Sequence, residues 1–104
     1  MSDPVLRTWQ SRTRLEDGDV YETFLRDRAS PDYAAIEGIE ALYFSRRVVD
    51  DTAVFLLITI WRDLAAVRAF AGDEASIAKY YPEDERFLLE KDLHAHNHHL
   101  FHSL

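Results

Sequence analysis

The most apolar stretch of the chain covers residues 53–61, which read AVFLLITIW and carry no charge. Its β-branched and aromatic residues favour a β-strand. Side chains alternate between the two faces of a strand, so Phe55 and Leu57 point to one face and Leu56 to the other. Both faces are apolar, so each of them needs a cover. We expect helices of the same chain to cover one face and a second copy of the chain to cover the other.

Two segments that precede this run also have the character of strands. Val5–Arg14 is rich in β-forming residues and contains neither Gly nor Pro. Ile39–Val49 is separated from the central run only by the polar residues Asp50-Asp51-Thr52. A short polar connection between two apolar segments is typical of a β-hairpin. The sequence therefore predicts strands over both segments, the second of them paired with the central strand.

Helical spacing appears between the first two strands. Asp19 and Glu22 have the spacing of a capping box, which predicts that a helix begins there. Ser30-Pro31 should end this helix, because Ser is a good cap and Pro suits the first turn of a new helix. A short second helical piece is expected over residues 32–37.

The central strand is followed by a second amphipathic pattern. Asp63 can cap a helix over Leu64–Ala71, and Gly72 can end it. The elements expected to complete the chain are a short helix capped by Asp73, a surface turn over residues 83–89 and a strand over residues 93–101.

The predicted order is β-α-β-β-α-β, which is the split βαβ arrangement of an α+β, ferredoxin-like protomer. Its sheet is antiparallel, and the first and third strands lie in the middle. Helices can cover only one face of such a sheet. The other face would expose an apolar patch larger than monomers usually show, which predicts a homodimer with two sheets packed face to face.

Length and charge narrow the class of protein. A chain of 104 residues with 47% hydrophobic residues is expected to form one domain over residues 1–104. Its 12 Lys and Arg against 19 Asp and Glu give a net charge of −7, so nucleic acid and anionic membranes are not expected partners. No apolar run is long enough to span a membrane, and the first residues do not resemble a signal peptide, so we expect a soluble cytoplasmic protein.

Several short motifs resemble one family. They are Arg7-Thr8-Trp9, Trp61, the AFAGD of residues 69–73, the YYPED of residues 80–84 and the FLLE of residues 87–90. Together they are similar to the antibiotic biosynthesis monooxygenase-like family of dimeric α+β barrels. The resemblance implies a ferredoxin-like protomer, a homodimer and a pocket between sheet and helices. Characterised members oxidise quinol-type aromatic substrates with O₂ without metal or flavin, so no cofactor is expected.

The same family contains relatives that degrade haem, and these use an Asn on the first strand, a Trp on the second helix and a later His. In this chain Thr8 or Gln10 occupies the first position, Phe70 the second and Tyr80 the third. The resemblance therefore does not imply haem chemistry here.

The candidate substrate-binding residues are aromatic. Trp9, Tyr43, Trp61 and Phe70 are a suitable wall for a small aromatic ligand, because small-molecule pockets are mostly apolar with a few polar groups. The alternative is that they are core residues, since large aromatics dominate the cores of small domains.

Three residues are candidates for catalysis. Arg46 lies on the face of its strand opposite to Tyr43, and a fixed cation there could stabilise a phenolate or enolate. His98 or Tyr80 could accept the proton of the substrate. The other reading is that such groups are solvated or paired at the surface.

All five histidines lie between positions 94 and 102. Strand alternation would place His94, His96, His98 and His102 on one face and His99 on the other. Alternate imidazoles can share a zinc, nickel or copper ion, but we expect them to form the polar end of the last strand, and no metal ligand is assigned.

Two functions fit this sequence. The first is a cofactor-independent monooxygenase that oxidises a small aromatic or polyketide-like molecule with O₂. The second is a non-catalytic dimer of the same fold that binds or senses a small molecule, since function lives in the site and not in the fold.

Overall fold

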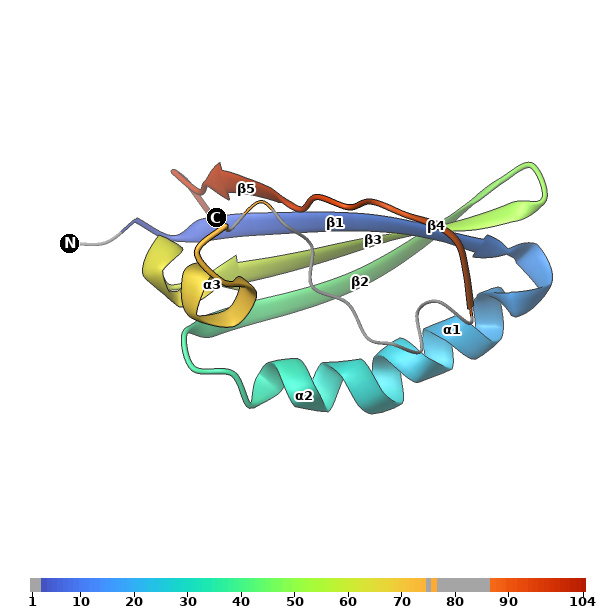
Figure 1. The fold of residues 1–104 in the computed structure, drawn as a ribbon, viewed down its shortest axis with the longest axis horizontal. Helices are drawn as coiled ribbons and strands as arrows, with labels where there is room; N and C mark the ends of the chain where they lie inside the picture. The colour runs from blue at the N-terminus through green and yellow to red at the C-terminus, as the bar shows by residue number, and fades with distance from the viewer. Residues whose placement is uncertain (1–2, 75, 77–86) are drawn as a thin grey trace.

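The computed structural model describes residues 3–74, 76 and 87–104 of the chain. Within them the protein is a single antiparallel sheet with helices against one of its faces (Figure 1). None of the helices in these described ranges is long and apolar enough to cross a membrane.

The centre of the sheet is the pairing of β1 (Val5–Arg14) with β3 (Thr52–Trp61), which runs the full length of both strands. On the other side of β3 lies β2 (Ile39–Val49), the edge strand of the sheet. Along the other side of β1, β4 (Leu88–Lys91) and β5 (His96–His99) pair one after the other (Figure 1). The predicted α+β fold, with the first and third strands in the middle, is confirmed.

Three of the helical segments join end to end into one rod, and a fourth is a short separate helix. The rod begins after the 3₁₀ turn η1 (Leu15–Asp17) and contains α1 (Gly18–Phe24), the π-helical turn η2 (Leu25–Ala29) and α2 (Ser30–Ala34). The separate helix, α3 (Leu64–Ala71), follows the central strand at one end of the sheet (Figure 1).

Three boundaries agree with the prediction residue for residue, namely those of β1, β2 and α3. The cap of α3 is also as expected, because the Asp63 carboxylate accepts a hydrogen bond of 2.8 Å from the backbone N–H of Ala66. The hairpin connection bends at Asp50, which has a φ of 54° in the left-handed region that Asp tolerates.

The prediction that Ser30-Pro31 ends the first helix is wrong. The backbone N–H of Ser30 bonds to the carbonyl of Leu25 five residues earlier, which closes a π turn, and the helix continues to Ala34. A proline inside an α-helix clashes with the carbonyl four residues before it and provides no N–H for that carbonyl. The wider π turn relieves this conflict without breaking the helix. The expected second piece over residues 32–37 is therefore the end of one continuous rod.

The predicted capping box at the start of α1 is also absent. The residue that precedes the helix is Asp17, and no side chain caps the first turn. The carboxylates of Asp19 and Glu22 bind the guanidinium of Arg46 on the sheet instead. A charged partner makes a stronger hydrogen bond than a free amide, which explains the preference.

The C-terminal strand expected over residues 93–101 is shorter, and it is preceded by a strand that the sequence did not indicate. Leu88 and Leu89 belong to β4 and not to a surface turn. Between β4 and β5 the chain leaves the ladder, and the Trp9 indole N–H donates a 2.7 Å hydrogen bond to the carbonyl of Asp92 in this gap. The helix expected after Asp73, over residues 77–82, and the first part of the expected turn lie outside the described residues.

The two faces of the sheet differ in what covers them. The face toward the helices is buried, and Tyr21 of α1 packs edge-on against Phe55 of β3 with ring centroids 4.9 Å apart. This core is largely aromatic and small aliphatic: it contains Trp9, Tyr21, Leu25, Ala29, Ala53, Phe55, Leu57 and Ala95, with Val5, Trp61, Ala66 and Val67 at the α3 end.

No described helix covers the opposite face, which we call the open face. Cross-strand register places on it Val54, Leu56, Ile58 and Ile60 from β3 and their neighbours Leu6, Thr8, Gln10 and Arg12 from β1. From β2 the same register adds Ala41, Tyr43, Ser45 and Arg47. Only Val54 among the β3 residues is fully buried, and the other three are half-buried.

The size of the open face suits a second copy of the chain. Its central strands are 10 residues long, which is about 33 Å, and neighbouring strands lie about 4.8 Å apart. Four strands across therefore give an area on the order of 600 Å², close to the roughly 800 Å² that each partner buries in a standard interface. Exposed apolar side chains from the C-terminal region, Leu93 and Phe101, add to the surface available for association.

We expect the chain to sediment near twice its mass of 12.1 kDa, and Leu56→Lys to convert it to a folded monomer. The ammonium would be unpaired at the covered interface, which costs several kcal/mol, but solvated in the monomer. Sedimentation equilibrium at micromolar concentration measures the mass, and far-UV circular dichroism monitors the fold.

The matched control is Thr23→Lys, which adds the same charge at an exposed position of α1. This variant should remain dimeric. A wild-type chain that sediments as a monomer would contradict the proposed assembly, as would a Leu56→Lys variant that dimerises as the wild type does.

Candidate functional site

One candidate site is a groove between the helical rod and the edge strand β2, with a volume of about 400 Å³. Volumes of this size are typical of sites for small organic molecules. The groove is open to solvent along one side, and apolar side chains alternate in it with charged ones. Its lining consists of Glu22, Leu25, Arg26 and Ser30 from the rod and Phe44, Ser45, Arg46 and Phe55 from the sheet.

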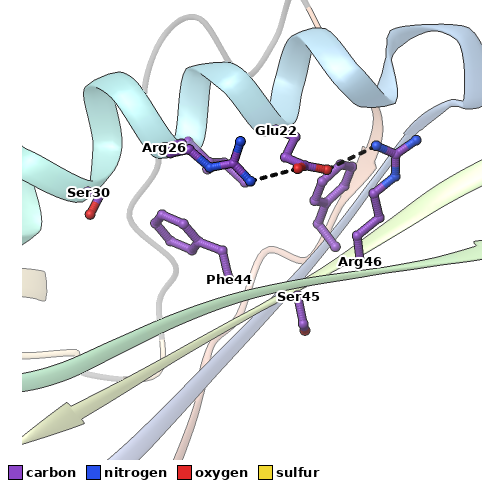
Figure 2. A pocket seen from close by; sticks show the side chains of 8 residues that line it. Glu22, Arg26, Ser30, Phe44, Ser45 and Arg46 are labelled. Atoms are coloured by element: carbon purple, nitrogen blue, oxygen red, sulfur yellow. Dashed lines mark hydrogen bonds and ion pairs between the residues drawn. The ribbon is translucent and has the colours of Figure 1, made fainter.

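The alternation of β2 decides which of its side chains face the groove. Phe44 and Arg46 point toward the helices, whereas Ser45 between them points away (Figure 2). The Ser45 hydroxyl instead donates a 2.9 Å hydrogen bond to the carbonyl of Leu56. Arg46 lies opposite Phe55 of β3, so an aromatic ring and a cation meet at the floor of the groove.

The helical wall is formed by Glu22, Arg26 and Ser30, which recur every four residues along the rod. An α-helix would rotate such a series steadily around its axis, because four residues exceed one turn of 3.6. The π turn over Leu25–Ala29 contains more residues per turn, and it keeps Ser30 on the groove side.

Arg46 is held in place by two carboxylates. Its Nη1 lies 2.8 Å from Asp19 Oδ1 and 3.1 Å from Glu22 Oε2, and its guanidinium carbon is 5.8 Å from the centre of the Phe55 ring. The hydrogen bonds that Arg46 donates to Asp19 and Glu22 raise its pKa above the ordinary value. Gly18 makes room for this arrangement, since a Cβ there would lie 2.5 Å from Arg46 Nη2.

Glu22 links both arginines of the groove. It accepts a 2.8 Å hydrogen bond from Arg26 as well as the bond from Arg46 (Figure 2). An Arg–Glu–Arg arrangement carries one net positive charge, and the exposed Asp19 compensates it on the outer side. Ionised guanidinium groups beside an aromatic floor can bind the oxygen of a phenolate or enolate.

A second, much smaller cavity lies deeper between sheet and helices, with a volume of about 20 Å³. Arg7 lines it, although only 5% of this residue is exposed. Burial lowers the pKa of Arg7 below its ordinary value, and its Nη1 donates a 3.1 Å hydrogen bond to Asn97 Oδ1. The other lining residues are Thr8, Trp9, Tyr33, Leu57, Thr59, Phe70 and Ala95.

Trp9 and Phe70, two of the predicted substrate-binding residues, thus share this small cavity. Trp61 is completely buried and does not line it. The Trp61 indole N–H donates a 2.7 Å hydrogen bond to Thr59 Oγ1, and its ring centroid is 5.1 Å from that of Phe70. Trp61 therefore packs against Phe70, which lines the cavity, without lining the cavity itself.

The remaining predicted residues are separated from these. Tyr43 is 59% exposed on the open face, and register places His98 opposite Leu6 on the same face. Arg46 lies in the groove on the helical side, and Tyr80 lies outside the described residues. The structure therefore brings together Trp9, Phe70 and Trp61, and it places Arg46 and His98 on opposite sides of the sheet.

Sequence reasoning missed Glu22 and Phe44 as site residues. The alternation of β2 places Phe44 and Arg46 on the same face, and this signal was available. Arg7 shares the inward positions of β1 with Trp9, which strand alternation also predicts. The role of Glu22 could not be found, because its spacing to Asp19 favoured a capping box.

The groove shows no metal-ligand set. Across residues 3–74, 76 and 87–104, no three His, Cys, Asp or Glu side chains gather where they could hold one ion. The chemistry that this arrangement can supply is thus binding of a flat apolar body and stabilisation of negative charge at one end.

No family model matches the sequence, and no curated protein matches it. The fold does match solved structures. One is a Bacillus cereus protein proposed to be an antibiotic biosynthesis monooxygenase, with a TM-score of 0.65 and 12% identity over 99% of this chain and 98% of that one. Another is PA3566 of Pseudomonas aeruginosa, with a TM-score of 0.68 and 20% identity over 98% of each chain. At these identities the likeness establishes a shared fold, as the sequence motifs suggested.

We expect Trp61→Phe to lower the free energy of unfolding by about 1–3 kcal/mol, because it leaves the buried Thr59 hydroxyl without its donor and creates a small void. Thr59→Val should also destabilise the protein, because it leaves the indole N–H unpaired. Urea unfolding of both variants and of the double variant measures the coupling.

The two effects should be non-additive by about 1 kcal/mol, since both variants break the same hydrogen bond. Val20→Ala, at an exposed position of α1, serves as the control and should change stability by less than about 0.5 kcal/mol. Strict additivity of the two core variants would contradict a structural role for this bond.

Proposed function

We propose that the chain is the protomer of a cofactor-independent monooxygenase that oxidises a small aromatic or polyketide-like molecule with O₂ in the groove between the rod and β2. The observation that carries the proposal is the position of Arg46, which two carboxylates fix beside the aromatic floor of an open groove of about 400 Å³. The fold shared with a proposed antibiotic biosynthesis monooxygenase supports the same reading.

The substrate would lie with its ring against Phe44 and Phe55 and with a hydroxyl toward Arg46. A cation held in a fixed position favours the ionised form of that hydroxyl, and the proton leaves to solvent at the open side of the groove. Asp19 and Glu22 are positioning residues in this scheme, because they orient the guanidinium and do not touch the reacting carbon.

The phenolate is electron-rich enough to reduce O₂ itself. One oxygen atom forms a carbonyl at a ring C–H carbon, and the other leaves as water together with the ring hydrogen and the hydroxyl hydrogen. A phenol and O₂ thus give a quinone and water. The substrate supplies all four electrons that O₂ accepts, so the reaction requires no separate reductant.

The second candidate function is binding of the same kind of ligand without oxidation. The observation that favours it is that Glu22, the one carboxylate among the described residues that line the groove, is bonded to both Arg26 and Arg46. Each of its two oxygens already accepts a hydrogen bond from a guanidinium group, so this carboxylate is engaged in positioning the two arginines. A dimer that recognises an aromatic anion would need no such acceptor.

Oxygen consumption with a panel of quinols and naphthols, measured on chelator-treated protein, decides between the two functions. We expect turnover on at least one compound and a fall in kcat/KM of about 100-fold in Arg46→Met, because the variant loses one charge that stabilises the anion. Ligand binding is measured in parallel by isothermal titration calorimetry.

Arg68→Met makes the same chemical change at an exposed position of α3 and should retain full activity. Equal activity of Arg46→Met and wild type would contradict the proposed role of the groove. Binding of a phenol without oxygen consumption would support the second function in place of the first.

A further inference from the structure

Three of the five histidines form a column on the open face. Ala95 belongs to the buried core, and Asn97 accepts a hydrogen bond from a buried arginine on the helical side. Successive side chains of an extended strand point to opposite faces. Register places His96 and His98 of β5 on the open face, and His94, which precedes the inward Ala95, is expected on the same side. All three are exposed.

This column lies at a defined corner of the open face. β5 runs antiparallel to the first half of β1, with His96 opposite Thr8 and His98 opposite Leu6. The function proposed above does not use these histidines, because the groove is on the other side of the sheet. Their chemistry therefore requires a separate explanation.

Imidazoles at alternate strand positions are suited to metal binding. Their Cα atoms lie about 6.6–6.8 Å apart, and both rings leave the sheet on the same side. Two imidazole nitrogens can then approach one ion at the distance of about 2.0–2.1 Å that zinc requires. Neutral imidazole suits zinc, nickel and copper and does not suit magnesium. The net charge of −7 also favours a cation over an anion at this surface.

One chain supplies only part of such a site. Among the described residues no three metal-ligating side chains gather around one point, so an ion receives two imidazoles from one column. A tetrahedral zinc ion needs further ligands. The open face is the surface that a second copy is expected to cover, and a two-fold axis through the β5 corner would bring the column of one copy against that of the other.

We propose that His94, His96 and His98 form half of a zinc-type transition-metal site, which a second copy of the chain completes across the open face. Each copy contributes an adjacent pair of imidazoles, and the ion links the two sheets. The inference rests on the face-to-face dimer and is independent of the proposed oxidation.

The remaining histidines provide an internal control. His99 pairs opposite Val5, which is an inward residue, and its Nδ1 lies 3.9 Å from Asp3 Oδ2. His102 follows the end of β5 in the exposed C-terminal segment. A His99→Gln, His102→Gln variant therefore removes imidazoles without changing the column.

Sedimentation equilibrium of the untagged full chain tests the proposal, first in EDTA and then with increasing Zn²⁺ or Mg²⁺. Zinc should tighten association of wild type by about tenfold when free zinc is about ten times its Kd, because binding to the dimer alone shifts the equilibrium by that factor. Magnesium should have no effect. The response to zinc should persist in His99→Gln, His102→Gln and disappear in His94→Gln, His96→Gln, His98→Gln.

An equal zinc response in the triple variant and in wild type would overturn the assignment to the column. Zinc binding to wild type, seen by calorimetry, with no change in association would overturn the contribution of the second copy. The EDTA measurement reports the dimer without metal, so a chain that dimerises there and ignores zinc overturns the metal site and leaves the dimer standing. A chain that is monomeric with and without zinc overturns both.

Discussion

The pairing of β1 with β3 is the interaction on which the other elements depend. The two strands are joined along their whole length, from Val5 opposite Trp61 to Arg14 opposite Thr52. Because this ladder lies in the middle of the sheet, its inward side chains form the floor that α1, α2 and α3 pack against. Apolar side chains lie on both faces of this ladder, and the helices cover only one of them. The same pair of strands thus forms both the centre of the core and the apolar centre of the open face.

The charged groups of the candidate groove come from the elements beside this central ladder and not from the ladder itself. Arg46 and Phe44 come from the edge strand β2, and Glu22 comes from the rod that faces it. β2 is an edge strand, and Phe55 of the neighbouring strand β3 completes the floor of the groove. Arg7, outside the groove, differs because it lies on the central strand itself and is buried there beside Asn97. Its guanidinium places a positive charge in the interior of the protein, whether or not a ligand is bound.

Much of the fold could be predicted because local signals and burial agree. Three local patterns each favour a single structure, and the protein has that structure in each case. They are the apolar run around Phe55, the polar turn at Asp50 and the cap at Asp63. One failure occurred where a side chain had two possible partners. Asp19 could cap a helix or bind Arg46, and only the packing of the rod against β2 decides between them.

The candidate site was harder to predict for the same reason. Sequence reasoning could name Trp9, Phe70 and Arg46, but their mutual distance depends on which of two cavities each residue borders. Tyr43 and Arg46 are three residues apart, and strand alternation alone sends them to opposite faces. Pattern reasoning identifies such residues reliably as inward or outward. Which of these residues share one site depends on the curvature of the sheet and on the path of the helices, and the sequence pattern does not reveal either.

The π turn over Leu25–Ala29 has a consequence for how this fold can vary. Regular α-helical geometry over the same residues would rotate α2 by about 100° relative to α1, because each residue of an α-helix advances the chain by about 100°. Tyr33 would then leave the inner cavity and Ser30 the groove, while the strands and their hydrogen bonds stayed as they are. Substitutions that straighten this one turn would therefore exchange the lining of both cavities at once and leave the sheet intact, whereas deletion of one residue from the turn would give regular α-helix with α2 facing as it does now.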